Sequence, residues 1–583
     1  MFGGSRWQSM SKAQVQMVAL TSIIALFGAV WMATSQPQEQ SCCRCFPGDD
    51  CWPSPEEWNG FNETISGGLI ATVPIASPCH DGFPGVEYDA EKCADIQANW
   101  ARPSLHFAST HSTMASFFAN LSCDPFTPRD SPCVAGAYVS YAVNASGVSE
   151  YRETVAFAKK HNIRLVIRNT GHDYMGKSTG AGALALWTHN IKALSVLDYT
   201  SPAYAGKAMK IGAGVQASEA QALAKANGLV VVEGDCPSVG IAGGYTQGGG
   251  TSPLASKFGL AADQVLEWEV LTGKGEFLTA TPTQNSDLYW ALCGGGGGTY
   301  GVVLSMTVKL HQDQPTAGAT LSFAESSDVV YWNLVRSFLM NLPAILDAGA
   351  TVYFQFLPGN TFSLPQSYFL GGTAEDLEHL FQPTIQALNQ SGIPYTWNSS
   401  DFPAFRDAFD TLNPEMDIFE FNLGGRLIPR SLVLSEGSAT SLVSAIKSIV
   451  AQGGIVAAVA MDVSRPPTFP NSVHPLWRES VFMTFLGTMY DRLNMTNNII
   501  DQRKVTHVFD PALEELTPGG AAYLNEADIH QPDWQNVFYG ANYPRLAAIK
   551  KAYDPDGIFW GPTAVGSEGW SVSGDGRLCK TPT

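Results

Sequence analysis

The chain has 583 residues and a formal net charge of −19, with 15% charged and 45% hydrophobic residues. This acidic balance disfavours nucleic acid or an anionic membrane surface as the main partner, because phosphate binding needs a basic field. An aromatic content of 11% argues against long disorder, and the composition fits a folded protein of about two to four domains.

The N-terminus has the order of a secretory signal. Arg6 and Lys12 precede an apolar run over 17–32, and small residues follow at 33–35, where a signal peptidase would cleave. The run is shorter than the about 20 residues that span a bilayer. We therefore predict a signal peptide over 1–35 and a secreted protein. The alternative is an uncleaved segment that anchors the chain in the endoplasmic reticulum or a vesicle lumen, and only then would a membrane be a stable partner.

Cysteines concentrate in the segment that follows, 36–128. Eight of the eleven cysteines lie between Cys42 and Cys133, which indicates disulfides formed in an oxidising compartment, with a connectivity that the sequence leaves open. The first four include no C-x-x-C pair, so we predict no metal site. Sequons that permit glycosylation stand at Asn62, Asn120, Asn144, Asn389, Asn398 and Asn494.

Strands and helices alternate from 129 to 312. A helix over 149–160 precedes a strand over 164–168, and a strand over 208–215 precedes a second helix. Ser218 and Gln221 have the spacing of a capping box at the start of that helix, which ends at Gly228. Further strands are predicted over 229–233, 264–271 and 302–310.

The pattern changes from 313 to 525. Longer helices over 326–342, 374–390 and 438–452 alternate with strands such as 351–357 and 455–463. This region contains no glycine-rich nucleotide loop, and it predicts an antiparallel sheet covered by helices on one face. The stretch 523–559 is dense in aromatic residues, Asn and Asp, which is more typical of a site than of a linker.

Three glycine-rich loops indicate the function. They are RNTGHDYMGKSTG (168–180), GDCPSVGIAGGYTQGGG (234–250) and CGGGGGTYG (293–301). Glycines let backbone N–H groups approach a phosphate closely. A P-loop sequence is absent, and the third loop leads into a strand rather than a helix, so the Rossmann fingerprint is missing too. A phosphate-bearing cofactor held by another kind of loop is therefore predicted.

These residues resemble a known family. The stretch 164–180, with His172 in T-G-H-D-Y-x-G-K-S, resembles the flavin-attachment loop of FAD-linked oxidases of the vanillyl-alcohol-oxidase type, which have a PCMH-type FAD-binding domain. The closest branch is the berberine-bridge-enzyme-like oxidases. The likeness continues through the other two loops and returns in FYGANYPRL (538–546) and YDPDGIF (553–559), while the Cys-rich start, C-F-P-G-D-x-C-W-P-S (45–54), resembles the secreted fungal subgroup.

The resemblance implies an α+β fold. A two-part FAD-binding domain would comprise 129–312 and a C-terminal berberine-bridge-like segment, 526–583, that returns to it. An α+β substrate domain would comprise 313–525. The residue types are apt for covalent attachment, because a neutral imidazole or a thiolate can add to an electron-poor flavin.

Individual site residues follow from the resemblance. His172 matches the histidine bonded to the flavin 8α-methyl, and Cys236 stands where some members bond a cysteine to flavin C6. The alternative, structural interpretations are a histidine that hydrogen-bonds a turn and a cysteine that is a small buried hydrophobic residue. We interpret Cys293 as such a buried cysteine. The other residues expected to contact FAD are Arg168, Asn169, Thr170, Gly171, Asp173, Ser178, Val239, Gly240, Gly243, Gly244, Gly248, Gly249, Gly250, Asp263, Val302 and Asn542.

Two further expectations concern reactivity. Val239 occupies a position that resembles an oxygen gate, where valine accompanies reaction with O2. Tyr245 and Thr251 depart from the family, which often has histidine at the first position and histidine or an aromatic residue at the second, and this leaves the substrate open.

The catalytic base is predicted to be Tyr539, which resembles a tyrosine that some members place over the flavin. An unperturbed tyrosine has a pKa near 10, so it would need help from its neighbours to act as a base. Glu420, His474 and Arg478 are further candidates, although such groups are more often structural.

The leading prediction is a secreted, monomeric FAD-linked oxidase with covalent flavin. It would take a hydride from a small alcohol, amine or secondary metabolite to flavin N5 and pass the electrons to O2. The alternatives are a carbohydrate or oligosaccharide oxidase and a flavin-binding protein without turnover.

Overall fold

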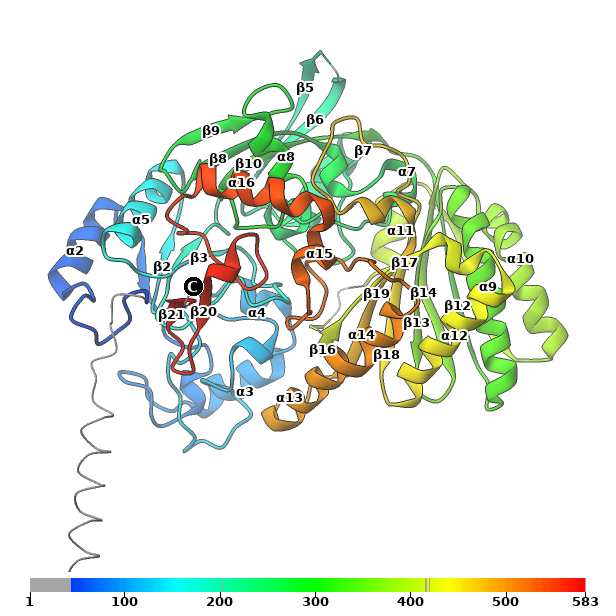
Figure 1. The fold of residues 1–583 in the computed structure, drawn as a ribbon, viewed down its shortest axis with the longest axis horizontal. Coiled ribbons are helices and arrows are strands. Elements are labelled where there is room, and N and C mark those ends of the chain that lie inside the picture. Colours follow the sequence, from blue (N-terminus) through cyan, green and yellow to red (C-terminus); the bar gives the residue numbers. More distant parts are fainter. Residues whose placement is uncertain (1–42, 203, 415–416, 419, 582–583) are drawn as a thin grey trace, which may run out of the picture. The chain divides into compact units, whose positions relative to one another are not determined.

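The computed structural model describes residues 43–202, 204–414, 417–418 and 420–581. The predicted signal peptide and the first residues of the Cys-rich segment lie outside the described residues. Residues 44–581 form one compact unit (Figure 1).

The flavin-side region is defined as 44–312 together with 526–581, and it includes the predicted FAD-binding domain. It contains a small, mostly parallel sheet. Its strands occur in the order β1 (Leu69–Ala71), β2 (Tyr141–Asn144), β4 (Leu184–Trp187) and β3 (Leu165–Arg168). Strands β2, β4 and β3 are parallel, whereas β1 pairs antiparallel with β2. Every residue of β4 is buried, as expected for a strand covered on both faces. Helix α5 (Val148–Lys160) packs Tyr151 and Val155 into the core below, which also contains Trp58 and Phe61 of α2 (Pro55–Thr64).

An antiparallel sheet of five strands completes this region. Its order is β5 (Leu194–Ser201), β6 (Tyr204–Gly212), β10 (Gly301–Lys309), β8 (Val265–Thr272) and β9 (Phe277–Ala280). The short strands β7 (Leu229–Val230) and β11 (His311–Gln312) form a separate pair. Helices α8 (Ser286–Leu292) and α16 (Tyr543–Tyr553) pack together beside the sheet, so the C-terminal segment returns to the flavin-side region (Figure 1).

The predicted capping box of the next helix is wrong by two residues. Helix α6 is Ala217–Ala226, and its cap is Gln216, whose backbone N–H donates to Glu219 Oε2 at 2.7 Å. The backbone N–H of Ser218 instead donates to the Pro237 carbonyl at 2.9 Å. The same i,i+3 spacing occurs in both pairs, and the contact with the second glycine-rich loop decides which one is used.

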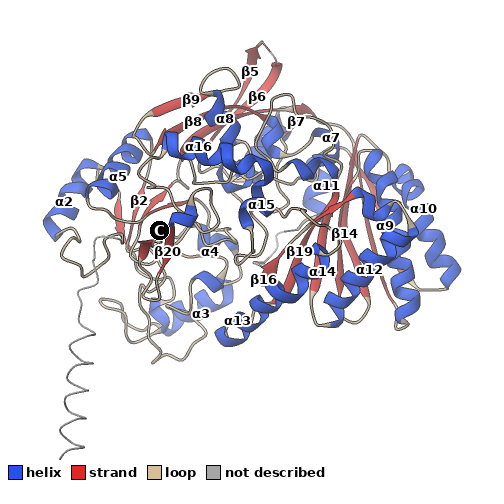
Figure 2. Cartoon of the chain, in the orientation of Figure 1, coloured by secondary structure: helices blue, strands red, loops and turns tan. Residues whose placement is uncertain are grey.

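The region 313–525 contains one large antiparallel sheet, as predicted. The strand order is β15 (Tyr395–Phe402), β12 (Thr316–Ala324), β14 (Thr361–Leu370), β13 (Thr351–Leu357), β18 (Ile455–Ala460), β19 (Ser480–Met489) and β16 (Phe421–Gly424), and β17 (Leu427–Pro429) also pairs with β19. Helices α9 (Asp328–Asp347), α10 (Ala374–Ser391) and α12 (Glu436–Ala451) cover one face (Figure 2).

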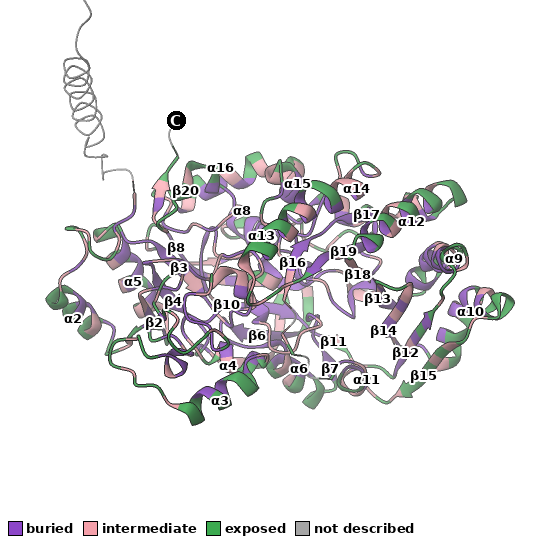
Figure 3. Ribbon diagram, turned by 90° about the horizontal axis from the view of Figure 1, so that it is seen from below, coloured by how far each residue is buried: buried purple, intermediate pink, exposed green. Residues whose placement is uncertain are grey.

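Alternation along the strands separates the two faces of this sheet. Phe356 on β13 and Ala458 on β18 pack under the helices, whereas Tyr353 and Val459 face the other way. Strand β19 is almost wholly buried, whereas exposed residues recur along α9, α10 and α12 (Figure 3). Two faces covered by different neighbours give the period-2 pattern.

Helix α9 is longer than predicted. It continues to Asp347 through Pro343, and it is the one helix in the described part of the chain with the length and hydropathy to cross a membrane. Its apolar residues, including Phe338 and Leu342, lie in the core between the helices and the sheet. Packing of α9 against the sheet therefore explains why this helix is so apolar.

The remaining segments border these two regions. Disulfides join Cys45 to Cys51, Cys79 to Cys93 and Cys123 to Cys133 within the described part of the Cys-rich segment. The other helices are α3 (Ala90–Asn99), α4 (Pro103–Phe107), α7 (Ala255–Phe258), α11 (Phe405–Leu412), α13 (Met495–Lys504), α14 (Asp510–Glu514) and α15 (Trp534–Tyr539). Strands β20 (Trp570–Val572) and β21 (Leu578–Lys580) form a C-terminal hairpin.

Candidate active site

A cavity of about 830 Å³ lies where the glycine-rich loops meet the uncovered face of the large sheet. One wall comes from the loops that follow β3 and β7 and from the loop that precedes β10. The other wall comes from β13, β18, β19 and the segment 523–526. This volume is in the range of cofactor and small-molecule sites.

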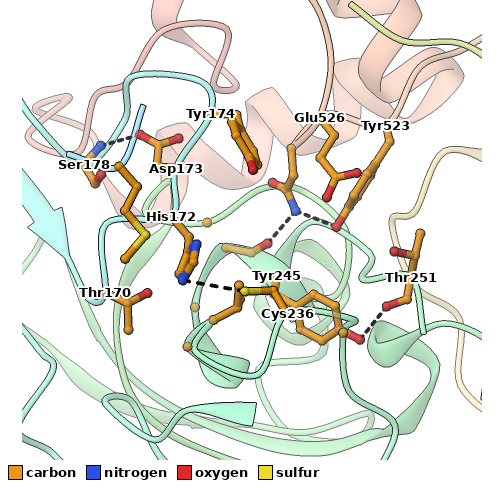
Figure 4. Close-up of a pocket in the computed structure, with 18 of the residues that line it drawn as sticks. Thr170, His172, Asp173, Tyr174, Ser178, Cys236, Tyr245, Thr251, Tyr523 and Glu526 are labelled. Atoms are coloured by element: carbon orange, nitrogen blue, oxygen red, sulfur yellow. Dashed lines mark hydrogen bonds between the residues drawn. The ribbon is translucent and has the colours of Figure 1, made fainter. Parts of the chain in front are cut away.

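His172 and Cys236 reach this cavity from two different loops (Figure 4). Nε2 of His172 is 2.8 Å from Ser238 Oγ and 3.9 Å from Cys236 Sγ. Burial, with smaller contributions from His106 and Arg168, lowers the pKa of His172 to about 3, so the imidazole is neutral at physiological pH. Burial raises the pKa of the Cys236 thiol. The structure thus brings together the two side chains that the sequence predicts as covalent anchors.

Bare backbone forms the floor of the cavity. A Cβ at Gly240 would lie 2.0 Å from Asn169 Nδ2, and one at Gly297 would lie 2.6 Å from Gly244 Cα. Side chains at these positions would separate the loops from one another. Asn169 Oδ1 and Gln247 Oε1, on residues of the cavity lining, are buried without a hydrogen-bond partner among the described residues. Backbone N–H groups and unpaired polar atoms fit a large polar cofactor.

Known proteins share most of this chain. The FAD-linked oxidoreductase sor8 of Hypocrea jecorina is 46% identical over 97% of this chain and 98% of its own length. A family model described as "FAD binding domain" matches 139–281, and one described as "Berberine and berberine like" matches 522–566. The chain belongs to the FAD-linked oxidoreductases of the vanillyl-alcohol-oxidase type, in the berberine-bridge-enzyme-like branch.

Solved structures support the same assignment. The VAO-type flavoprotein MtVAO615 of Myceliophthora thermophila is 41% identical, with a TM-score of 0.89 over 92% of this chain and 100% of that one. The glucooligosaccharide oxidase of Acremonium strictum shares only the fold, at 18% identity and a TM-score of 0.63 over 74% of this chain and 92% of that one. The floor described above fits the FAD that defines this family.

Asp173 fixes the conformation of the loop 168–180, which carries His172. Its Oδ1 accepts a hydrogen bond from the Met175 N–H at 2.9 Å, and its Oδ2 accepts from the N–H groups of Lys177 and Ser178, the latter at 2.8 Å. An aspartate that binds its own backbone in this way fixes a turn. Asp173, Thr170 and Ser178 all line the cavity, and the Asp173 carboxylate is already used within the loop.

Arg168 lies behind the cavity and supports the same loop. Its guanidinium donates to the carbonyls of Ser109 at 3.1 Å and His106 at 3.0 Å. Gly171 has φ +93°, and a Cβ there would be 2.7 Å from Arg168 Nη2. Only glycine meets both conditions without a shift, because this φ disfavours L side chains and the space is filled.

The structure leaves several of the predicted cofactor residues off the cavity. Gly248, Gly249, Gly250 and Val302 lie outside its lining, although their neighbours Gln247, Gly301 and Val303 belong to it. A Cβ at Gly248 would be 2.5 Å from Asn525 Nδ2, so this glycine allows the second loop to pack against the C-terminal segment. The remaining predicted residues Asn169, Gly171, Val239, Gly240, Gly243 and Gly244 line the cavity.

Asp263 and Asn542 make structural contacts away from the cavity. The Asp263 carboxylate accepts from Arg478 at 2.7 and 2.8 Å and from Asn471 at 2.7 Å. Asn542 Nδ2 donates to the Ser472 carbonyl at 3.1 Å. Both residues therefore join the loop 464–474 to the flavin-side region, and Arg478 serves as a structural cation rather than a base.

The structure does not place Tyr539 on the cavity. This residue is fully buried, and its hydroxyl donates to the Thr563 carbonyl at 3.0 Å. Burial raises its pKa above the ordinary tyrosine value, which opposes a role as a base.

The other candidate bases have structural partners. Glu420 accepts hydrogen bonds from Ser116 and Arg492. Nδ1 of His474 accepts from the Leu476 N–H at 3.1 Å.

Several polar groups of the cavity were not predicted from the sequence. Tyr174 and Asp235 come from the first two glycine-rich loops, Tyr353 comes from β13, and Glu526 comes from the C-terminal segment. Tyr245 and Thr251, the two residues that differ from the family pattern, contact each other. The Tyr245 hydroxyl donates to the Thr251 carbonyl at 2.8 Å. The acid within the aromatic and Asn-rich stretch 523–559 was the signal that could have identified Glu526.

Proposed function

We propose that this protein is a secreted FAD-dependent oxidase whose flavin is attached covalently to His172 and Cys236, and which oxidises a small alcohol, amine or secondary metabolite with O2 as acceptor. The observation that carries the proposal is the pair itself: two nucleophilic side chains from separate loops, 3.9 Å apart on one cavity. A single His or Cys in a glycine loop would be far weaker support.

The state of each side chain suits attachment. Since Nε2 of His172 contacts Ser238 Oγ, Nδ1 is left without a hydrogen-bond partner among the described residues. Burial raises the pKa of the Cys236 thiol, so a base must take its proton before the sulfur attacks. Each attachment exchanges a C–H bond of the cofactor for a C–N or C–S bond, and O2 takes up the two electrons and two protons as H2O2. The Acremonium glucooligosaccharide oxidase carries a flavin described as 6-S-cysteinyl, 8α-N1-histidyl FAD.

The bound cofactor supplies an electron-poor ring that accepts a hydride. The protein would hold that ring between the glycine-rich loops and the large sheet. Val239, three residues after Cys236, lines the cavity, and its small side chain leaves room for O2. The disulfides in the Cys-rich segment support an oxidising compartment, in agreement with the predicted signal peptide, and we expect a monomer.

Mass spectrometry of a proteolytic digest tests the attachment. Peptides that contain His172 or Cys236 should carry the mass of FAD, and acid-precipitated protein should stay yellow. His172→Ala and Cys236→Ala should each lose one link. Cys293→Ala is the matched control, because this other free cysteine is buried off the cavity, where the Trp268 indole N–H donates to its sulfur at 3.3 Å.

Turnover is tested separately with a panel of benzyl alcohol, 4-hydroxybenzyl alcohol and cellobiose. Bleaching of the flavin with release of H2O2 is expected for the aromatic alcohols. A response to cellobiose alone would instead support a carbohydrate oxidase. A flavin that none of them reduces would support a binding protein, and colourless precipitated protein would refute the attachment.

A further inference from the structure

The Glu526 carboxylate is unpartnered in the cavity. It lies next to the Tyr523 ring (Figure 4), and no group among the described residues donates a hydrogen bond to it. Its backbone is fixed, since its N–H donates to the Tyr523 carbonyl at 2.9 Å. Asn525 anchors the same turn to the second glycine-rich loop by donating to the Gly244 carbonyl at 2.9 Å. The carboxylate is therefore held in place without being used by the fold.

The other acids that line the cavity, Asp173, Asp235 and Asp417, have partners. The Asp235 carboxylate accepts from Gln366 Nε2 at 2.7 Å, and Gln366 Oε1 in turn accepts from the Tyr368 hydroxyl at 2.8 Å. Glu420, which lies off the cavity, is paired with Arg492. Glu526 is half-buried, and withdrawing a carboxylate from water without a donor is costly to the fold. An unpartnered carboxylate on a cavity wall therefore points to a partner that arrives with the ligand.

The groups around Glu526 favour a carboxylate that can take up a proton, because none of the described ones is a cation that would hold it ionised. Burial, together with the charge of Asp235, raises the pKa of Glu526 to about 7. The other titratable groups that face it are neutral phenols from separate elements, and their pKa values are raised mainly by burial. They are Tyr174, Tyr245, Tyr353 and Tyr523. A carboxylate with a pKa near the working pH accepts a proton effectively and can release it again.

The cavity wall also indicates the kind of substrate. Tyr174 and Phe485 meet edge to face with ring centroids 5.7 Å apart, and Phe485 meets Phe421 in the same way at 5.2 Å. All three line the cavity, together with Met483 and Met489. Aromatic rings and thioethers favour an aromatic or alicyclic body, and the Asp235 and Glu526 carboxylates disfavour an anion.

We propose that Glu526 is the general base of the oxidation, and that the substrate is an uncharged hydroxyl compound with an aromatic or alicyclic body. This inference rests on the proposed function. Glu526 takes the hydroxyl proton while the neighbouring carbon gives up a hydride, so a C=O bond replaces the C–H and O–H bonds. The flavin receives the two electrons, O2 removes them as H2O2, and the proton on Glu526 leaves to water.

Reduction of the flavin by 4-hydroxybenzyl alcohol tests this role in the purified full-length protein. Glu526→Gln should slow anaerobic bleaching by about 10²–10⁴-fold with unchanged covalent flavin. In the wild type, the bleaching rate should rise with pH through an apparent pKa near 7, the value given for Glu526. The Gln variant should lose this limb, and Glu526→Asp should keep it at a reduced rate. The matched control is Glu515→Gln, which removes an exposed carboxylate of the same segment.

A second measurement does not depend on turnover. Infrared difference spectra between pH 5.5 and 8.5 should show loss of protonated carboxyl absorption, part of which comes from Asp235, with a pKa of about 6. The component that titrates near pH 7 should be present in the wild type and in Glu515→Gln and missing in Glu526→Gln. Equal bleaching rates in the wild type and Glu526→Gln, or a component near pH 7 that persists in the variant, would overturn the role of Glu526 alone. A wild-type flavin that neither alcohols nor amines bleach would overturn the proposed function itself.

Discussion

The two walls of the cavity are built in opposite ways. The flavin-side wall consists of three loops, each a short continuous stretch of sequence, and glycine backbone forms much of its surface. A Cβ added there would make contacts as short as 2.0 Å. The sheet-side wall takes side chains from strands between 351 and 489, and Tyr353 and Met483 belong to strands that are not neighbours in sequence. The comparison shows that the loop wall depends on backbone geometry and the sheet wall on side-chain choice.

The largest expected effect comes from a single methyl group on the flavin side. Gly297→Ala should reduce flavin content per folded molecule by at least about tenfold, because its Cβ would lie 2.6 Å from the Cα of Gly244. A glycine of the other region is the matched control. Gly437, exposed in α12, has nothing within 4 Å of an added Cβ, so Gly437→Ala should leave the flavin content unchanged and alter stability by at most about 1 kcal/mol. Equal flavin loss in both variants would contradict the comparison.

An intermediate effect is expected in the core under the sheet. Phe338 on α9 is fully buried between the helices and the strands, away from the cavity lining. Phe338→Ala should lower the free energy of unfolding by about 3–5 kcal/mol, measured by denaturant titration. The protein that remains folded should keep its covalent flavin, and loss of flavin in proportion to stability would show that the two walls do not act separately.

The smallest effect concerns pH and the Asp235 carboxyl. Burial raises its pKa from 3.8 to about 6, so the folded state binds this proton more tightly than the unfolded state. The free energy of unfolding therefore falls as pH rises from about 4 to about 6, because the unfolded state loses this proton first. The melting temperature of Asp235→Asn, measured relative to the wild type, should therefore rise over this pH range. A constant difference would show that the carboxyl titrates normally.

The sequence predicts those parts of the structure that depend on short segments. The helices and strands of both regions occur close to the expected positions, because hydrophobic periodicity is local. Errors arise where a tertiary contact intervenes: the cap of α6 moves from Ser218 to Gln216 because the second loop accepts the Ser218 N–H. Strand β7 ends at Val230 rather than at 233.

The sequence by itself determined the cofactor side, namely the three loops, the family and the pair His172 and Cys236. Those features reside in contiguous stretches whose glycines have a direct physical meaning. Only the tertiary structure decided which of the candidate bases lie on the cavity. It buried the Tyr539 hydroxyl against Thr563 and left the Glu526 carboxylate on the cavity wall with no hydrogen-bond donor among the described residues. The physical reason is that a proton acceptor is defined by its surroundings, and the surroundings of Glu526 come from loops, strands and a C-terminal turn that only folding brings together.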